Sequence, residues 1–231
     1  MNSITNYLFL TESCNIALMN NIAKTKNIAN RFRGFLPVVV DIETAGLNPK
    51  TDAILEIAAI IIDMDKNGLV YPKETHFAHV IPFEGANLDP EALEFTGIDP
   101  YQPLRFAVSE EEALDTISKP IRKAMKDSGC YKAILVGHNP IFDISFLQAA
   151  VKRTNYKHDP FHSFTTLDTA TLAALAYEHT VLAVAAKRSG IEFEVQHAHS
   201  ALYDATKTAE LFCNIVNKWQ EFTAGLHQSK Q

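Results

Sequence analysis

From residue 36 to residue 64 the chain reads LPVVVDIETAGLNPKTDAILEIAAIIIDM, and this stretch decides the fold we expect. Two apolar runs, at 36–43 and 53–64, flank the segment AGLNPKTD, whose Gly, Asn, Pro and Asp residues are typical of turns. A third apolar run follows at 69–83. The pattern therefore predicts three strands joined as an antiparallel meander.

Helical patterns follow the meander. The segment DPEALEF (89–95) predicts a short helix, and residues 109–129 predict a long one, because Ser109 and Glu112 are placed to form a capping box at its start. Pro120 lies inside the long helical pattern and should kink or split that helix.

The second half of the chain combines a buried strand with helices. KAILVG (132–137) predicts the strand, and a helix should follow with Asn139 as its N-cap and Pro140 at its first position. After a loop at 155–164 we expect helices at 169–179, at 180–188 and at about 200–219. Strands followed by strand–helix units predict an α/β fold, with a mixed β-sheet flanked by α-helices.

Length and composition are those of one ordinary globular domain. The chain has 231 residues, of which 47% are hydrophobic, and shows no internal repeat or linker. Residues 1–30 are polar and weakly patterned, so we expect a partly disordered N-terminal extension, with Met19 as an alternative start. The domain should span 31–219, and a C-terminal tail should occupy 220–231.

Charge and cysteine content bear on partners and location. The net charge of −6 would repel nucleic acid, so a polynucleotide partner would need local basic clusters or bound cations. Cys14, Cys130 and Cys213 form no Cys-x-x-Cys pair, which favours buried thiols in a reducing cytoplasm. No apolar stretch approaches the roughly 20 residues of a membrane span, and the N-terminus lacks the features of a signal peptide. We expect a cytoplasmic protein without a membrane segment.

Asp41 and Glu43 end the first apolar run. They are two residues apart on a predicted strand, so their side chains share one face. Neighbouring carboxylates repel each other, and a bound divalent cation is the usual remedy. The alternative is that both carboxylates face water at the end of the strand.

Three further acidic residues and one histidine each have a structural and a chemical interpretation. Asp143 lies in the first turn of a predicted helix, where the helix dipole favours a carboxylate, and Asp168 is placed to cap the helix that follows it. His199 lies on a loop, five residues before Asp204 in the last helix. A loop histidine beside a fixed carboxylate suits a general base, although surface histidines near helix starts are common.

Taken together, these residues favour the chemical interpretation. Carboxylates from a strand, two helix starts and a last helix would balance two divalent cations. Such cations, about 3.5–4 Å apart, clamp the attacking and leaving oxygens of a phosphodiester displacement. His199 would then deprotonate the attacking water.

Four motifs resemble those of the DEDDh 3′-to-5′ exonucleases, a family with a ribonuclease H-like fold. They are DIET (41–44), HNPIFD (138–143), TTLDT (165–169) and HSALYD (199–204). The segments RFRGF, GANLDPEALEF and HAHSALYD narrow the resemblance to the members that trim RNA 3′ ends. The resemblance covers about residues 31–219.

This resemblance implies a metal site, a general base and a substrate class. The implied metal ligands are Asp41, Glu43, Asp143, Asp204 and, partly through water, Asp168. His199 is implied as the general base, with two Mg²⁺ per active site and Mn²⁺ as an alternative. The family implies a homodimer that trims the 3′ ends of transfer RNA and of other stable RNA precursors. It also acts on single-stranded DNA, and it releases nucleoside 5′-monophosphates.

The resemblance also assigns residues to the terminal bases. Phe95, Phe142 and Phe164 match positions that stack on these bases, and Glu91 matches one that reaches a base edge. Leu47 stands where the family usually has phenylalanine, so an apolar contact remains and the aromatic face is lost. Core packing is the alternative for the three phenylalanines.

Basic residues are implied to bind the substrate backbone across the dimer: Arg31, Arg33, Arg122, Lys123, Lys126, Lys132 and Lys157. Lys119 joins three of them in a stripe along one predicted helix, at spacings i, i+3, i+4 and i+7, which is otherwise typical of a solvated face. Lys132 replaces an expected arginine and keeps the charge without the bidentate geometry.

Three rival interpretations stay open on sequence alone. Another DEDDh enzyme, such as a polymerase proofreading subunit or an oligoribonuclease, would share the catalytic residues but not the RFRGF and GANLDPEALEF segments. A non-catalytic nucleic-acid-binding module should have lost a carboxylate or His199, and none is lost. A structural scaffold would use every carboxylate as a cap.

Overall fold

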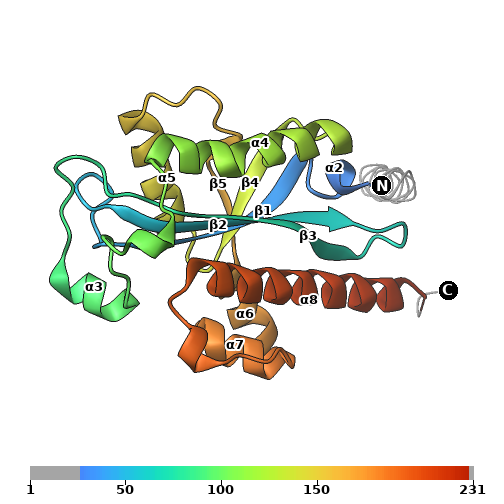
Figure 1. Cartoon of the computed structure of the whole chain (residues 1–231). Coiled ribbons are helices and arrows are strands. Elements are labelled where there is room, and N and C mark those ends of the chain that lie inside the picture. Colours follow the sequence, from blue (N-terminus) through green and yellow to red (C-terminus); the bar gives the residue numbers. More distant parts are fainter. Residues whose placement is uncertain (1–26, 229–231) are drawn as a thin grey trace, which may run out of the picture.

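The computed structural model describes residues 27–228, in which five strands form one sheet with the order β3-β2-β1-β4-β5 (Figure 1). The strands are β1 (Phe35–Thr44), β2 (Ile54–Met64), β3 (Val70–His79), β4 (Lys132–Gly137) and β5 (Phe161–Asp168). The first three pair antiparallel, as the predicted meander requires, while β4 and β5 add in parallel. The predicted mixed sheet is confirmed.

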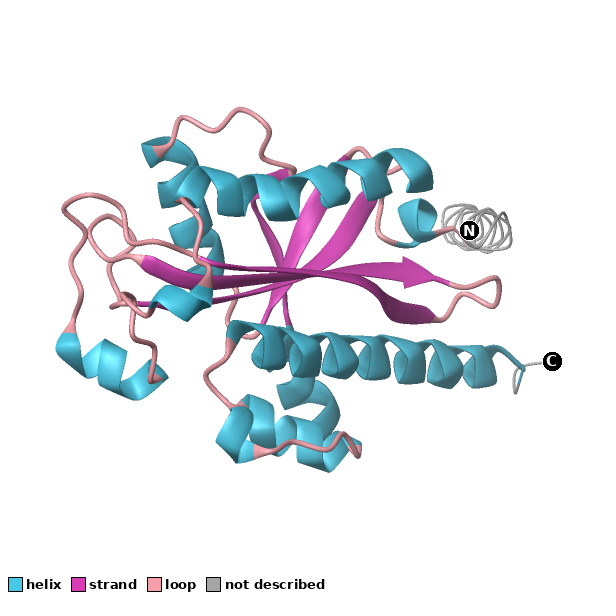
Figure 2. Cartoon of the chain, viewed as in Figure 1, coloured by secondary structure: helices cyan, strands magenta, loops and turns pink. Residues whose placement is uncertain are grey.

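Helices cover both faces of this sheet (Figures 1 and 2). α4 and α5 lie on one face, and α8 lies along the other, with α6 and α7 packed beyond α8. The α-helices are α2 (Ile28–Arg31), α3 (Pro90–Thr96), α4 (Glu110–Ser128), α5 (Ile141–Arg153), α6 (Thr169–Tyr177), α7 (Leu182–Ser189) and α8 (Ala201–Gln228). Two 3₁₀ turns, η1 (Pro103–Arg105) and η2 (Val195–His197), complete the elements.

The central strands are buried because they lie between the two helical layers. Val38, Val39 and Val40 of β1 are fully buried, which explains why their run in the sequence is apolar without alternation. Phe146 of α5 and Phe212 of α8 belong to the same core cluster as these valines. The core therefore holds β1, which carries two of the candidate site residues, from both sides.

Helix α4 starts as predicted but is not split. The Ser109 hydroxyl accepts from the Glu112 N–H at 3.3 Å, and the Glu112 carboxylate accepts from the Ser109 N–H at 3.0 Å. Pro120 lies within a single helix that runs from Glu110 to Ser128. Ile117 and Ile121 are both fully buried beside it, so packing on the sheet offsets the lost backbone hydrogen bond.

Two boundaries near the site differ from the prediction. The segment 155–164, expected to be a loop, contains the start of β5, whose residues are mostly exposed or half-buried and so give a weak apolar signal. Asn139 is not the N-cap of α5: it has φ of +66°, Pro140 occupies the cap position, and the helix starts at Ile141. The start of α5 therefore has no hydrogen bond from a capping side chain.

The ends of the chain also differ in part from the prediction. α8 continues to Gln228 instead of ending near Trp219. Cys14, Met19 and most of the expected N-terminal extension lie outside the described residues, although Ile28 in α2 is buried. Cys130 and Cys213 are buried free thiols, as predicted.

Within residues 27–228, no single helix is long and apolar enough to cross a membrane. The pair α6 and α7, bent by 46° at the break between them, meets the length and composition criteria only when taken together.

Candidate active site

Asp41 and Glu43 lie near the end of β1, and the register with β2 shifts just after Glu43. Burial, followed by the charges of Asp143 and Glu43, raises the pKa of Asp41 well above its ordinary value. Burial and the charge of Asp204 raise the pKa of Glu43 to about 8. These carboxylates repel one another at neutral pH unless protons or cations neutralise them.

Asp143 lies in the first turn of α5 and is 5% exposed. Burial and the charge of Glu43 raise its pKa to about 8, although hydrogen bonds from the backbone, including that of Ile42, act in the opposite direction. Stabilisation by the helix dipole alone would not require this depth of burial. Asp143 therefore belongs electrostatically to the same cluster as Asp41.

His199 and Asp204 meet Glu43 from the start of α8. Carboxylate oxygens of Glu43 and Asp204 and a ring nitrogen of His199 all lie within 4.8 Å of one another. The His199 backbone, which has φ of +67°, donates its N–H to Oδ2 of Asp204 at 2.9 Å. Residues distant in the sequence thus converge on one point at the end of β1.

One atom of this cluster is evidence for a cation site. Oδ1 of Asp204 is buried and has no hydrogen-bond partner in the described part of the chain. A buried carboxylate oxygen without a donor is costly, and a divalent cation would satisfy it. The raised pKa values of Asp41, Glu43 and Asp143 fit the same explanation, so the donor set suits a hard divalent cation.

Asp168 occupies a different environment. It caps α6 by accepting from the backbone N–H groups of Ala170 at 2.9 Å and Thr171 at 3.3 Å, and it also accepts from the N–H of Asn139 at 3.1 Å. Burial acts to raise the pKa of Asp168, but a hydrogen bond from the Thr171 hydroxyl and those from the three backbone N–H groups outweigh it, so the pKa is lowered. The predicted cap is confirmed, and the carboxylate does not join Glu43, His199 and Asp204 in the converging group.

The residues predicted to meet the terminal bases are largely accessible. Leu47 is 84% exposed, Phe95 67% and Phe164 80%, and Glu91 is exposed in the first turn of α3. The Phe95 ring lies 4.2 Å from the His199 ring, centroid to centroid.

Phe142 is placed between the two roles considered for it, core packing and stacking on a base. It is half-buried against the core, with its ring centroid 4.9 Å from that of Phe146. Core packing accounts for at least one side of this ring.

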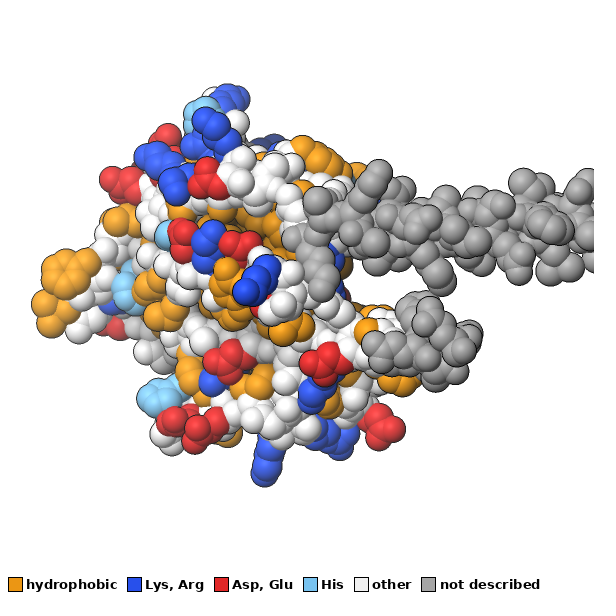
Figure 3. All heavy atoms as spheres, turned by 90° about the vertical axis from the view of Figure 1, so that its right-hand side faces the viewer, with side chains coloured by type: hydrophobic (Ala, Val, Ile, Leu, Met, Phe, Trp, Pro, Cys, Tyr) orange, Lys and Arg blue, Asp and Glu red, His pale blue; other side chains and the backbone are white. Residues whose placement is uncertain are grey.

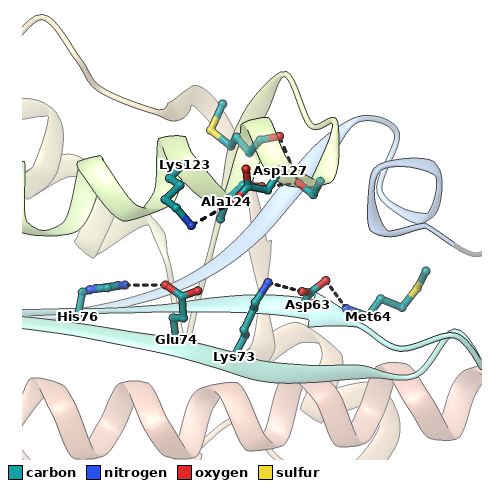
Figure 4. Close-up of polar contacts among 10 residues, drawn as sticks. Asp63, Met64, Lys73, Glu74, His76, Lys123, Ala124 and Asp127 are labelled. Carbon is teal, nitrogen blue, oxygen red and sulfur yellow. Dashed lines mark hydrogen bonds and ion pairs between the residues drawn. The ribbon is translucent and has the colours of Figure 1, made fainter.

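The basic residues of α4 are exposed, but two of them are paired. Lys119 lies 2.6 Å from Asp115, and Lys123 lies 3.3 Å from Asp127. Figure 4 shows the second pair close to the ion pairs of β2 and β3, and the face in Figure 3 carries acidic and basic side chains interspersed.

The other predicted basic residues differ in whether their charged groups are hydrogen-bonded within the chain. The Arg31 guanidinium is half-buried and donates to the carbonyls of Gly68 and Val216 at 3.3 Å each, as well as to Gln220. The Lys132 ammonium donates to the Asp159 carbonyl at 3.2 Å, and the Lys157 ammonium donates to the side chain of Asn155. Arg33 is exposed, with φ of +56°.

Two residues that sequence reasoning missed adjoin the site. His138 bridges the Thr169 hydroxyl at 3.0 Å and the Thr180 carbonyl at 2.6 Å, and so links the end of β4 to the loop after α6. Glu56 is 8% exposed in β2 and adds to the charge that raises the pKa of Glu43. A lone carboxylate inside the apolar run ILEIAAIII was the available signal for Glu56.

Comparison with known proteins gives a consistent result. A family model described as Exonuclease matches residues 38–212. The chain is 60% identical to ribonuclease T of Hahella chejuensis over 194 residues, which is 84% of this chain and 89% of that protein. It is 59% identical to ribonuclease T of Marinobacter nauticus over 194 residues, with 84% and 88% coverage.

Solved structures share the fold at much lower identity. E. coli exonuclease I in complex with a dT13 oligonucleotide superposes with a TM-score of 0.62 at 21% identity, over 84% of this chain and 43% of that chain. A 3′-exonuclease that recognises the histone mRNA stem-loop gives 0.61 at 18% identity, over 79% and 64%. The chain thus matches less than half of exonuclease I, and the predicted ribonuclease H-like fold is confirmed.

Proposed function

Since this chain belongs to the ribonuclease T family and is a divalent-metal-dependent 3′-to-5′ exonuclease, we propose that it trims short single-stranded 3′ ends of transfer RNA and other stable RNAs. Its products would be nucleoside 5′-monophosphates, and single-stranded DNA would be a second substrate. The observation that carries the proposal is the convergence of Glu43, His199 and Asp204 within 4.8 Å beside the exposed ring of Phe95.

The proposed metal ligands are the carboxylates of Asp41, Glu43, Asp143 and Asp204, with Asp168 acting through water. This assignment is supported by the unpartnered Oδ1 of Asp204 and by the raised pKa values of three of the carboxylates. We propose two Mg²⁺ ions, with Mn²⁺ as the alternative. When bound, such ions neutralise charge on the phosphate and on the attacking and leaving oxygens.

His199 is proposed to accept the proton of the attacking water at a ring nitrogen. It is exposed on a loop, so its ring can reach solvent, while its backbone N–H is held by Asp204. General bases of this kind contribute about 10²–10⁴-fold to rate. Asp168 would keep its capping hydrogen bonds and thereby hold the start of α6 beside the site.

The terminal bases are proposed to stack on Phe95 and Phe164 and to contact Leu47, with Glu91 at a base edge. The exposure of these side chains supports the assignment. Phe142 would offer only the part of its ring that does not pack on Phe146. Stacking accepts any base, which suits an enzyme that trims ends of varied sequence.

A homodimer is proposed because the basic stripe lies on α4, which the sheet separates from α8, whose first turn carries Asp204 (Figure 1). The stripe consists of Lys119, Arg122, Lys123 and Lys126. RNA bound at the start of α8 would have to pass around the sheet to reach the stripe of its own chain. A stripe supplied by a second copy avoids that path. Arg33, Lys132 and Lys157 would extend the same surface. Arg31 would belong to it as well, although its contacts with backbone carbonyls hold it more rigidly.

The test is trimming of a duplex RNA with a single-stranded 3′ overhang, with and without Mg²⁺. Wild type should release mononucleotides until it nears the duplex, and Asp41→Ala and His199→Ala should not. A wild-type chain that binds the RNA but never shortens it would instead support a non-catalytic binding module.

A further inference from the structure

A buried glutamate outside the proposed ligand set lies next to it. Glu56 of β2 is paired with Glu43 of β1 in the sheet register, so the two side chains project from the same face. On its other side, Glu56 is paired with His79 of β3. A row of three side chains thus runs across the sheet from the candidate active site to the edge strand.

One carboxylate oxygen of Glu56 has a hydrogen-bond partner: Oε2 accepts from the backbone N–H of Ala201 at 3.2 Å. Oε1 lies 3.1 Å from Nδ1 of His79, but this approach does not have the geometry of a hydrogen bond. Ala201 is the first residue of α8, two residues after His199 and three before Asp204. Glu56 therefore joins the sheet to the segment that carries both of these site residues.

This arrangement is not what packing alone would select. Like charges directly opposite each other on paired strands destabilise a sheet, and a buried carboxylate is costly unless it is hydrogen-bonded. The first N–H groups of a helix have no partner within the helix, and Glu56 satisfies one of them from outside α8. An apolar residue at position 56 would pack well in β2 but would leave that N–H without its acceptor.

We propose that Glu56 is a positioning residue that fixes the start of α8 against β2, through its hydrogen bond from Ala201, and so directs His199 and Asp204 toward Glu43. The inference rests on the proposed function of the site. The His199 backbone donates its N–H to Asp204, which belongs to α8 itself, so this hydrogen bond does not attach the segment to the sheet. The hydrogen bond from Ala201 to Glu56 does, and it reaches the sheet that carries Asp41 and Glu43.

The test compares three variants at a temperature where all remain folded. Glu56→Ala removes the link, and Glu56→Gln keeps an oxygen that accepts from Ala201. Glu110→Ala is the matched control, because Glu110 is also a buried glutamate (6% exposed) with an ion-pair partner, Arg153, at 2.6 Å. This pair joins α4 to α5 on the other side of the sheet.

We expect Glu56→Ala to slow the trimming of RNA overhangs, with kcat lowered by about 10²-fold and little change in KM, because a misplacement of ~1 Å has an effect of that size. Glu56→Gln should restore most of the turnover, and Glu110→Ala should reduce thermal stability without changing kcat. Turnover of Glu56→Ala as fast as that of Glu110→Ala would overturn the proposal. So would Glu56→Gln as slow as Glu56→Ala, since the charge itself would then be required.

Hydrogen exchange of residues 199–204 in the absence of metal and RNA gives a second readout, independent of activity. Exchange there should be faster in Glu56→Ala and unchanged in Glu110→Ala, and equal exchange in wild type and Glu56→Ala would overturn the proposal. If wild type does not shorten RNA at all, the proposed function fails, and the exchange rates still decide whether Glu56 holds the start of α8.

Discussion

The backbone N–H of His199 donates to Oδ2 of Asp204 over 2.9 Å, so the proposed base and a proposed metal ligand are fixed to each other across the start of α8. Oδ1 of the same carboxylate has no hydrogen-bond partner within residues 27–228. Burial raises the pKa of Asp204, although the hydrogen bond from His199 acts in the opposite direction. One oxygen thus holds the loop, and the other has no donor and is available to the proposed cation.

The stability of the metal-free protein should fall as pH rises. The pKa of Glu43 is raised from 4.5 to about 8, so the folded chain holds this proton more tightly than the unfolded chain does. The resulting stabilisation is complete below the unfolded value of 4.5 and is lost as pH rises through about 8. We expect Tm in EDTA to fall by several degrees across this window, at roughly 2–4 °C per kcal/mol for a domain of this size.

Mg²⁺ should reduce this pH dependence, because it neutralises the same carboxylates. Asp41→Asn removes one of the repelling charges and should therefore raise the metal-free Tm near the upper end of the window while abolishing trimming. Calorimetry with and without metal measures the stability effects. A metal-free Tm that is flat with pH, or an Asp41→Asn variant that is less stable than wild type there, would contradict the electrostatic account.

His199→Ala should slow trimming by about 10²–10⁴-fold, because it removes the proposed base. RNA affinity should change little, since the carboxylates and aromatic side chains remain. Single-turnover kinetics and fluorescence anisotropy separate the two quantities. His197→Ala is the matched control: this histidine is also exposed, pairs with Glu194 at 3.3 Å and should be dispensable. A parallel loss of binding and rate in His199→Ala would indicate a binding role instead.

The parts of the fold with strong local signals were predictable from sequence. The β1–β2 hairpin has two long apolar runs around a turn, and the capping box of Ser109 marks the start of α4. β5 was missed because it is the edge strand next to β4 and exposes polar residues such as His162 and Thr165 in part. Its strand identity comes from pairing with β4, which no local pattern reports.

The same distinction applies to the site. Each motif could be found by itself, but the sequence does not state that Glu43 and Asp204 come within 4.8 Å, because tertiary packing of α8 on the sheet brings them together. The capping role of Asp168 was predictable, since it depends on the next three residues. The role proposed for Glu56 was not predictable, because the groups next to its carboxylate lie on β3 and α8.

Phe95→Ala should raise the KM for RNA overhangs. Its ring is 67% exposed beside His199, and the loss of one base stacking interaction costs ~1–3 kcal/mol, or about 5- to 150-fold. Phe95→Trp keeps an aromatic face and should stay close to wild type. Steady-state kinetics on overhangs of fixed sequence measure the effect, and equal KM values for Phe95→Ala and wild type would remove Phe95 from the proposed base site.

Leu47→Phe should improve binding of the terminal base. Leu47 is 84% exposed, so a larger side chain meets no steric obstacle, and the loop that carries it is held by Asp52, which accepts from the Asn48 N–H at 2.9 Å. A gained aromatic face should lower KM by about 3- to 10-fold. Leu47→Met, which keeps an apolar contact without a ring, is the control. If both variants lower KM equally, apolar contact and not stacking is the cause.

Mixing two inactive variants tests whether the basic stripe of one protomer serves the active site of another. Asp41→Ala disables the site and leaves the stripe intact, whereas a double Arg122→Glu and Lys123→Glu variant disables the exposed stripe and leaves the site intact. Since the sheet separates α4 from α8, a heterodimer should pair the intact stripe of the first variant with the intact site of the second, and trimming should return. A mixture of Asp41→Ala with His199→Ala should stay inactive, because neither protomer then has a working site. If the complementary mixture also stays inactive although heterodimers form, the stripe acts on its own protomer or not at all, and the proposed division of labour across the dimer is wrong.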